Sequence, residues 1–267
     1  MNEAGLFARY ATASIRAQVQ YPASTAMLAL GQCLVTVIEA LGIAALFHRF
    51  GGVQGWRFGE VALFYAIVNL QFSLADVLSR GFDVLGTELL RSGEFDRLLL
   101  RPRSLTVQLM GHAVRLSRLG RFVTAVAMLA LATKLAPLDW SGAHLALGAW
   151  AVAGGIALFF GIMVLQGALA FWTVESLEIA NVFTYGGVEA AQYPLALYER
   201  WLRLVLTFLV PLACVAYFPV LAILDRADPL GTPAWFGALA PAAGFAFLAL
   251  AYLAWRAGLR RHASSGS

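Results

Sequence analysis

Six long apolar runs constrain the fold of this chain more than any other feature of its sequence. A helix that crosses a lipid bilayer needs about 20 apolar residues, and each run reaches that length. We expect membrane spans at residues 23–47, 58–79, 116–136, 144–172, 202–224 and 237–256. Charged residues make up 13% of the chain, against about 25% in soluble domains. The sequence therefore predicts an all-α integral membrane protein with a single domain over residues 1–267.

The first 21 residues precede the first apolar run and do not have the pattern of a signal peptide. Charged residues, among them Glu3, Arg9 and Arg16, interrupt them, whereas a signal peptide has one continuous apolar core. Apolar side chains recur at steps of three and four residues, at Leu6, Tyr10, Ala13, Ala17 and Tyr21. This spacing favours a helix that lies in the membrane interface, and the alternative is a frayed tail.

The basic residues predict how the chain is oriented. Six spans place both termini on the same side as the loop at residues 80–121, and fifteen of the nineteen basic residues fall on that side. Because Lys and Arg prefer the cytoplasmic side of short loops, we expect both termini to be cytoplasmic. The basic residues flank the spans and form no stripe with interleaved aromatic residues, so nucleic acid is not an expected partner.

The loop at residues 80–121 contains a short charged segment, residues 92–103. Ser92 or Gly93 can cap a helix, and Glu94 and Asp96 suit its first turn. Pro102 ends the segment, because the residue before a proline avoids the helical conformation. We expect a helix of about two turns, with the alternative of an ordinary solvated connector. The arginines that follow, at steps of three, resemble interfacial anchors with possible contacts to membrane lipids: Arg115, Arg118 and Arg121.

Polar residues within the first two spans are candidates for a function at membrane depth, because a charged group there is costly. Glu39 in the first span is either a pathway residue or a hydrogen-bonded structural residue. Asn69, Ser73 and Asp76 in the second span step by four and three residues, so they share one helix face. That face meets either another helix or a transport pathway.

The second half of the chain yields three structural expectations. Small residues at four-residue spacing predict close helix packing in the fourth span, at Ala149, Ala153, Ala157 and Gly161. Residues 173–201 are more polar and predict a cytoplasmic helical connection. Pro211 and Pro219 predict kinks in the fifth span.

Motifs for catalysis and for metal or nucleotide binding are absent from the sequence. It has no P-loop, H-E-x-x-H or G-x-S-x-G pattern, and its four histidines are scattered without ligand spacing. Cys33 and Cys214 lie in apolar runs and read as core residues. We therefore expect no catalytic residue, no metal site and no cofactor in this chain.

The segment Gly93-Glu-Phe-Asp-Arg-Leu-Leu-Leu-Arg-Pro102, set between the second and third of six spans, carries a family resemblance. With the N-terminal interfacial helix, it is similar to bacterial membrane permeases of type-2 ATP-binding-cassette exporters, in the daunorubicin-resistance-like branch. Pro194 and the pair Pro211 and Pro219 fit the same branch. The resemblance covers almost the whole chain.

This resemblance implies that residues 93–102 form a coupling helix that docks on an ATPase subunit. The docking residues it implies are Glu94, Phe95, Asp96, Arg97, Leu98 and Arg101. Two permeases, identical or sister chains, would pair in the inner membrane with two ATPase subunits that bind ATP and Mg²⁺. Spans one, two and five would line the path, and the resemblance leaves the substrate open.

Two further readings remain at this point. An ATP-independent secondary transporter or channel would use Glu39 or Asp76 with protons. A membrane enzyme or scaffold ranks last, because the chain pairs no catalytic groups at membrane depth.

Overall fold

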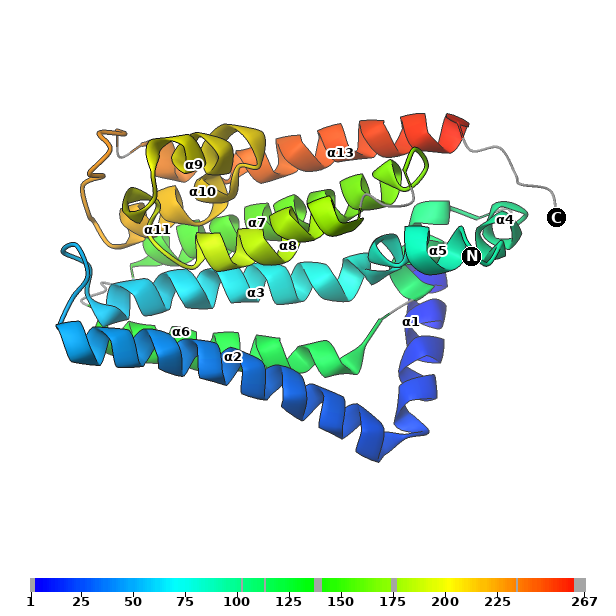
Figure 1. Ribbon diagram of the computed structural model, residues 1–267, viewed down its shortest axis with the longest axis horizontal. Helices are drawn as coiled ribbons and strands as arrows, with labels where there is room; N and C mark the ends of the chain where they lie inside the picture. The colour runs from blue at the N-terminus through cyan, green and yellow to red at the C-terminus, as the bar shows by residue number, and fades with distance from the viewer. Residues whose placement is uncertain are drawn as a thin grey trace.

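The computed structural model describes residues 3–101, 103–112, 114–136, 141–173, 177–233 and 235–261, and no β-strand occurs among them. Long helices run along one axis (Figure 1). The loop between α2 and α3 lies at one end of this bundle, and α1, α4, α5 and the last turn of α13 lie at the other (Figure 1). The prediction of an all-α integral membrane protein is confirmed.

The described chain contains thirteen α-helices, two π-helical turns and two 3-10 turns. The α-helices are α1 (Glu3–Val19), α2 (Pro22–Phe50), α3 (Phe58–Asp83), α4 (Glu94–Leu99), α5 (Leu105–His112), α6 (Leu119–Leu135), α7 (Gly142–Leu169), α8 (Leu177–Ala191), α9 (Arg200–Leu204), α10 (Leu212–Val215), α11 (Tyr217–Ile223), α12 (Phe236–Leu239) and α13 (Ala242–Arg261). Leu85–Leu89 and Val205–Leu209 are π-helical turns, and Leu116–Arg118 and Leu195–Leu197 are 3-10 turns.

Five helical segments of the described chain are long and apolar enough to cross a membrane. They are Pro22–Phe50, Phe58–Asp83, Leu116–Leu135, Gly142–Leu169 and Phe236–Arg261. These five coincide with expected spans, and each boundary follows local chemistry. Pro22 begins α2, where its missing N–H is not needed, and Gly51 ends it in the left-handed conformation with φ 70°.

α3 is the central helix of the bundle. It packs against α6 and α7 along its length and also contacts α2, α5 and α8. Its polar side chains Asn69, Gln71 and Asp76 are buried together with its apolar ones. Gly81 brings α3 against α5, because a Cβ at this position would lie 2.0 Å from the carbonyl oxygen of Leu109. The helix α5 is therefore fixed directly to the central helix.

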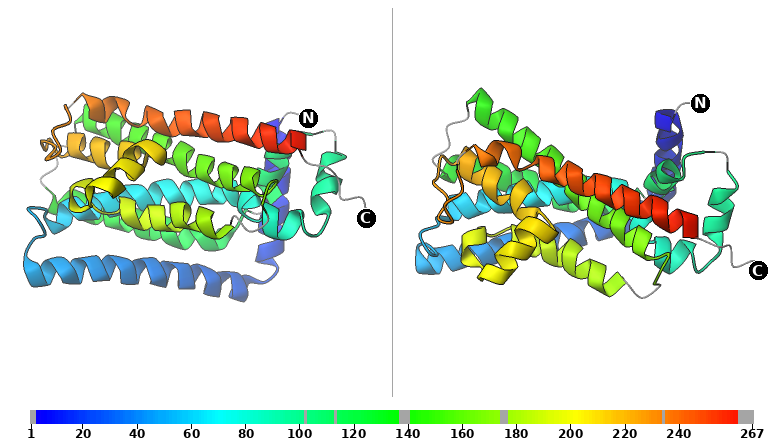
Figure 2. Two further views of the ribbon diagram at one scale, coloured as in Figure 1. Left: turned by 45° about the horizontal axis from the view of Figure 1, so that its top comes forward. Right: turned by 90° about the horizontal axis from the view of Figure 1, so that it is seen from above.

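α1 lies across the end of the bundle instead of along it. Figure 1 and the left view of Figure 2 show it turned steeply away from α2, which begins three residues after α1 ends. α1 packs on α5, with Leu6 buried and Arg9 and Arg16 exposed. This orientation is the one expected of a helix in the membrane interface.

The expected span at residues 202–224 is broken near its middle, and the kink predicted at Pro211 is confirmed. Two helical pieces, Arg200–Leu209 and Leu212–Ile223, meet at a bend of 72°. Figure 1 shows the first piece running inward from the end that bears the α2–α3 loop and the second returning toward that end. The segment is therefore a re-entrant hairpin. Pro211 lies at its tip, where a proline cannot continue a helix.

The expected cytoplasmic connection at residues 173–201 is also wrong for α8, which packs inside the bundle. Thr184, Val188 and Gln192 are buried at four-residue steps, and Tyr185 packs edge-on against Phe72 of α3 with ring centroids 5.7 Å apart. With fifteen residues, α8 spans about 22 Å at the α-helical rise. It carries the chain from the α4 end to the start of the hairpin (Figure 2). Glu175 and the side chains of Glu178 and Asn181 lie outside the described residues.

α7 and α13 make the most extensive helix pair in the fold. The backbones approach where Gly154 of α7 meets Pro241 and Gly244, and again where Gly161 meets Leu248. Small residues allow such close approach in membranes. The predicted packing stripe is wrong at its first residue, because Ala149 is exposed and the close contact begins five residues later, at Gly154. Gly161, the last residue of the predicted stripe, does lie at the contact.

Candidate functional site

The predicted docking segment forms the helix α4 at the end of the molecule opposite the α2–α3 loop (Figure 1). Gly93 precedes it in the left-handed conformation with φ 71°, and the Glu94 amide donates to Ser92 Oγ at 3.3 Å. Glu94 and Arg97 are exposed, and Asp96 is half-buried. Leu99 and Leu100 are also exposed, at 47% and 84%. Pro102 lies outside the described residues.

Two of the predicted docking residues face the permease itself. Phe95 and Leu98 are only 1% and 5% exposed. The Phe95 ring packs on Phe171, which follows α7, with centroids 5.4 Å apart. Phe171 in turn contacts Trp255 of α13, and Trp255 contacts Phe82 of α3. This row of four rings, which we call the aromatic chain, joins α4 to three long helices.

α1 is fastened to the segment that leads from α4 into α6. Arg101, another predicted docking residue, donates from Nη1 to the Tyr10 hydroxyl at 2.6 Å. Gln18 donates to the Val114 carbonyl at 2.6 Å and accepts from the Leu116 amide at 2.8 Å. Ser14 Oγ also donates to the Val114 carbonyl, at 2.9 Å. α1 therefore holds the segment between α5 and α6 in place.

A polar seam joins α3 to the start of α6 inside the bundle. Arg118 Nε donates to Asp76 Oδ2 at 3.0 Å, and Arg121 Nη1 donates to Asn69 Oδ1 at 3.3 Å. The Arg121 guanidinium lies 5.1 Å from the centre of the Phe72 ring, within the range of a cation–π interaction. We use the term polar seam for Asn69, Asp76, Arg118 and Arg121.

The polar seam corrects the interpretation of two arginines as interfacial anchors. Arg121 is only 8% exposed, and the Arg118 side chain is 14% exposed, so both turn into the protein. They do so because the polar face of α3 places the Asp76 carboxylate beside Arg118 and the Asn69 amide oxygen beside Arg121. Arg115 is the exposed member of the series.

Glu39 of α2 lies beside the same region but is loosely held. The Tyr65 hydroxyl of α3 donates to the Thr36 carbonyl at 2.6 Å and reaches Glu39 Oε2 at 3.5 Å. Thr36 also bonds to Thr124 of α6 at 3.1 Å, so α2, α3 and α6 meet at this level. Glu39 itself is half-buried, which leaves its pathway or structural role open.

The sequence found part of this cluster. Asn69, Ser73 and Asp76 are all buried, as their shared helix face predicts. The Ser73 hydroxyl donates to the Leu70 carbonyl of its own helix at 3.0 Å. The arginine partners and Gln71 were missed. Gln71 donates to the carbonyls of Ala151 at 3.0 Å and of Val215 at 2.8 Å, and it thereby ties α7 and the hairpin to α3. The three-residue spacing of the arginines is the sequence signal that could have identified Arg118 and Arg121 as partners of α3. The same spacing also fits arginines at the membrane surface, which is what the sequence alone predicts.

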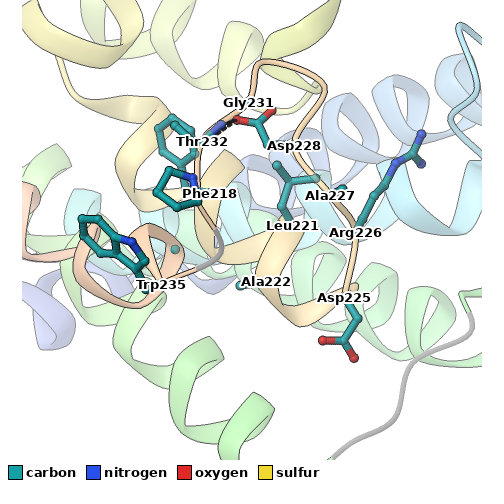
Figure 3. Close-up of a pocket in the computed structure, with 12 residues that line it drawn as sticks. Phe218, Leu221, Ala222, Asp225, Arg226, Ala227, Asp228, Gly231, Thr232 and Trp235 are labelled. Carbon is teal, nitrogen blue, oxygen red and sulfur yellow. Dashed lines mark hydrogen bonds between the residues drawn. The ribbon is translucent and has the colours of Figure 1, made fainter.

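The opposite end of the protein contains a cavity of about 730 Å³ between the hairpin and the loop that follows it. Figure 3 shows Arg226 extending away from this cavity and Asp228 bonded to Thr232. Arg226 pairs with Glu60 at 2.8 Å and lies 3.8 Å from the centre of the Trp56 ring. Asp228 also accepts from Tyr217 at 2.7 Å. These charged groups secure the loop to α3 and the hairpin.

Within the described part of the chain, no three His, Cys, Asp or Glu side chains are grouped closely enough to hold a metal ion. The family model for ABC-2 family transporter proteins matches residues 33–266. The chain belongs to this family. None of the curated proteins compared with it gives a match. The matched range contains every expected span apart from the first ten residues of the first.

Family membership identifies the chain as a permease subunit of an ATP-binding-cassette transporter and a multi-pass membrane protein. Such a permease associates with an ATP-binding-cassette ATPase. The resemblance drawn from the segment 93–102 is therefore confirmed at the level of the family. The six docking residues remain predictions, as does the assignment of Glu39, Asn69, Ser73 and Asp76 to a pathway.

Proposed function

We propose that this permease pairs with a second permease, identical or a sister chain, and exports a substrate across a bacterial inner membrane. Two ATPase subunits would bind ATP and Mg²⁺ and dock on the cytoplasmic face at α4. Both termini would be cytoplasmic. The substrate is left open.

The exposed and buried sides of α4 carry this proposal. Its outer side presents Glu94 and Arg97 together with the exposed Leu99 and Leu100. A charged pair beside apolar side chains is typical of the centre and rim of a protein interface. Its inner side is fixed by Phe95 and Leu98. We therefore assign direct ATPase contact to Glu94, Asp96 and Arg97, with Phe95 and Leu98 holding the helix.

The aromatic chain supplies a path for movement from α4 into the bundle. A displacement of α4 acts on Phe171 and Trp255 through close ring contacts, and packed interiors transmit such strain. A second path runs from α5 to α3 through the tight contact at Gly81. ATP-driven movement of the docked ATPase would thereby reach α3, α7 and α13 together.

Charge reversal on α4 tests the docking assignment. In Arg97→Glu, we expect the ATPase that co-purifies with the tagged permease to fall at least tenfold, since one lost charged contact costs about 1.5–3 kcal/mol. Arg91→Glu is the matched control, because Arg91 is exposed in the same loop but lies outside α4. Equal ATPase recovery with both variants would remove α4 as the docking site.

Cysteine labelling tests the orientation. After Cys33 and Cys214 are replaced by Ser, Arg97→Cys should react with a membrane-impermeant maleimide only in permeabilised spheroplasts. Asp225→Cys at the opposite end, with its side chain 79% exposed, should react in intact ones. The reverse pattern would place α4 outside the cell and defeat the proposal.

A proton-driven transporter that uses Glu39 or Asp76 is the second candidate. Asp76 is held in an ion pair with Arg118 inside the bundle. A proton carrier at this position would have to break that pair in every transport cycle, which works against this candidate. Proton-dependent flux in liposomes that hold the permease alone would support this candidate. Flux that requires the ATPase would support the exporter.

A further inference from the structure

A second cavity, separate from the polar seam and from α4, lies where α1 meets the bundle. Its volume is about 340 Å³, and it is bounded by α1, the first turns of α2, the Leu85–Leu89 turn and the segment before α6. The side chains that matter for its chemistry are Ser14, Gln18, Leu28, Glu88, Arg115 and Ser117.

The cavity lies beside one end of a candidate membrane span. Thr25 and Leu28, which line it, belong to the first two turns of α2, a candidate membrane span. α1 crosses the end of that span (Figure 1). Leu28 is 62% exposed, and the apolar residues Met27, Leu30 and Leu34 of α2 are exposed as well. One side of the cavity therefore opens onto an apolar helix surface that suits an acyl chain.

The cavity presents one positive and one negative group. Arg115 and Glu88 both line it and both are exposed, and neither side chain has an ion-pair partner among the described residues. The neighbouring wall is fixed, because Gln18 and Ser14 are engaged with Val114 and Leu116. The charges thus stand on a rigid frame at a junction of α1, α2 and α6.

We propose that this cavity binds a phospholipid whose headgroup carries a phosphate and a primary ammonium, as phosphatidylethanolamine does. Arg115 binds the phosphate, since a guanidinium matches its oxygens. Glu88 accepts hydrogen bonds from the ammonium. A choline headgroup has the same charges but no N–H donor, and a glycerol headgroup offers no cation to Glu88. The bound lipid links α1 to the bundle, and this assignment holds whether or not α4 docks an ATPase.

Lipid binding to the full-length permease tests the assignment. Native mass spectrometry in detergent, with equal additions of phosphatidylethanolamine, phosphatidylcholine and phosphatidylglycerol, should show roughly tenfold tighter binding of the ethanolamine lipid, the effect of one charged hydrogen bond. Soluble phosphoethanolamine at the same concentration should not compete, because it lacks the acyl chains that Leu28 contacts. Equal binding of the three lipids, or full competition by the free headgroup, would overturn the proposal.

Variants of Glu88 and Arg115 test whether these two residues cause the preference for the ethanolamine lipid. Glu88→Gln should abolish the preference for ethanolamine over choline, and Arg115→Gln should weaken binding of all three lipids, with partial rescue by Arg115→Lys. Arg91→Gln is the matched control for a lost surface arginine. A preference that persists in Glu88→Gln would exclude this cavity as its source. The wild-type ratio of the three lipids decides the lipid class even where a variant does not fold.

Discussion

α2 and α3 are neighbouring helices of nearly equal hydropathy that occupy opposite environments. The most apolar 18-residue stretches have mean hydropathies of 1.9 in α2 and 1.7 in α3, yet 22% of the first and 78% of the second is buried. The slightly less apolar helix is therefore the central one. Apolar content places both helices in the membrane, but it does not decide which of them the other helices surround.

Polar side chains account for the difference. A polar group at membrane depth needs a partner within the protein, so the helix that carries most of them is enclosed by others. α3 buries five such side chains, whereas α2 fully buries one, Thr36, on the side that faces α3 and α6. The buried side chains of α3 are Asn69, Gln71, Ser73, Asp76 and Ser79. Substitutions on the two helices should separate accordingly.

The largest difference is expected at the carboxylates. Asp76→Asn leaves Arg118 as a buried charge without its counter-ion and should lower the free energy of unfolding by about 3–5 kcal/mol. Glu39→Gln on α2 should cost less than about 1 kcal/mol, because Glu39 has only a contact at 3.5 Å to Tyr65. Denaturant unfolding in mixed micelles measures both values.

The charge swap is the control for Asp76. Asp76→Arg combined with Arg118→Asp restores opposite charges at the same two positions, so the double variant should be more stable than either single one. If Asp76→Asn and Glu39→Gln cost the same, the ion pair does not distinguish the two helices.

Glycines provide the next test. A Cβ at Gly81 of α3 would lie 2.0 Å from the backbone of α5, so Gly81→Ala should cost about 1–3 kcal/mol as the two helices separate. Gly42 of α2 has open space around it, and Gly42→Ala should be neutral or stabilising by up to about 1 kcal/mol. The same unfolding assay applies, and a stable Gly81→Ala would show that α5 moves freely against α3.

Local features of this fold could be predicted from the sequence. The five straight spans, the N-terminal helix α1 and the short helix α4 each depend on a continuous pattern within one segment. The hairpin could be predicted only in part, because Pro211 indicates a kink but does not show in which direction the chain continues after it. Residues 202–224 are apolar enough for a span, and only their neighbours show that both ends of the segment return to one side.

Long-range partners set the other limit on prediction. The spacing of Arg118 and Arg121 predicts an interfacial position, because the sequence does not show that Asp76, 42 residues before Arg118, and Asn69, 52 residues before Arg121, lie beside them. The polar residues of the segment 173–201 predict a solvated connection. The structure instead buries one face of α8, where Thr184, Val188 and Gln192 follow at steps of four residues. In each case polar side chains that the sequence suggests are at a surface are buried inside the bundle.

A smaller difference in stability between α3 and α2 is expected at their glutamines, Gln71 and Gln32. Gln71→Leu removes two hydrogen bonds, to Ala151 and Val215, and should cost about 1 kcal/mol, within the range measured for hydrogen bonds in membranes. Gln32→Leu is the control, since Gln32 is half-exposed on α2 and should change stability by less than about 0.5 kcal/mol. A larger loss with Gln32→Leu would mean that α2 holds a polar partner in the assembled transporter.

The outward side of α2 should give the smallest effect in the isolated permease. Leu34 is 60% exposed, and lipid solvates an alanine about as well as a leucine, so Leu34→Ala should change the unfolding free energy by less than about 0.5 kcal/mol. If this face packs against a second permease, the same variant should instead raise the fraction of monomer in mass photometry of the purified complex, without loss of monomer stability. Loss of stability in the monomer itself would show that α2 is packed within the chain, and the contrast with α3 would then fail.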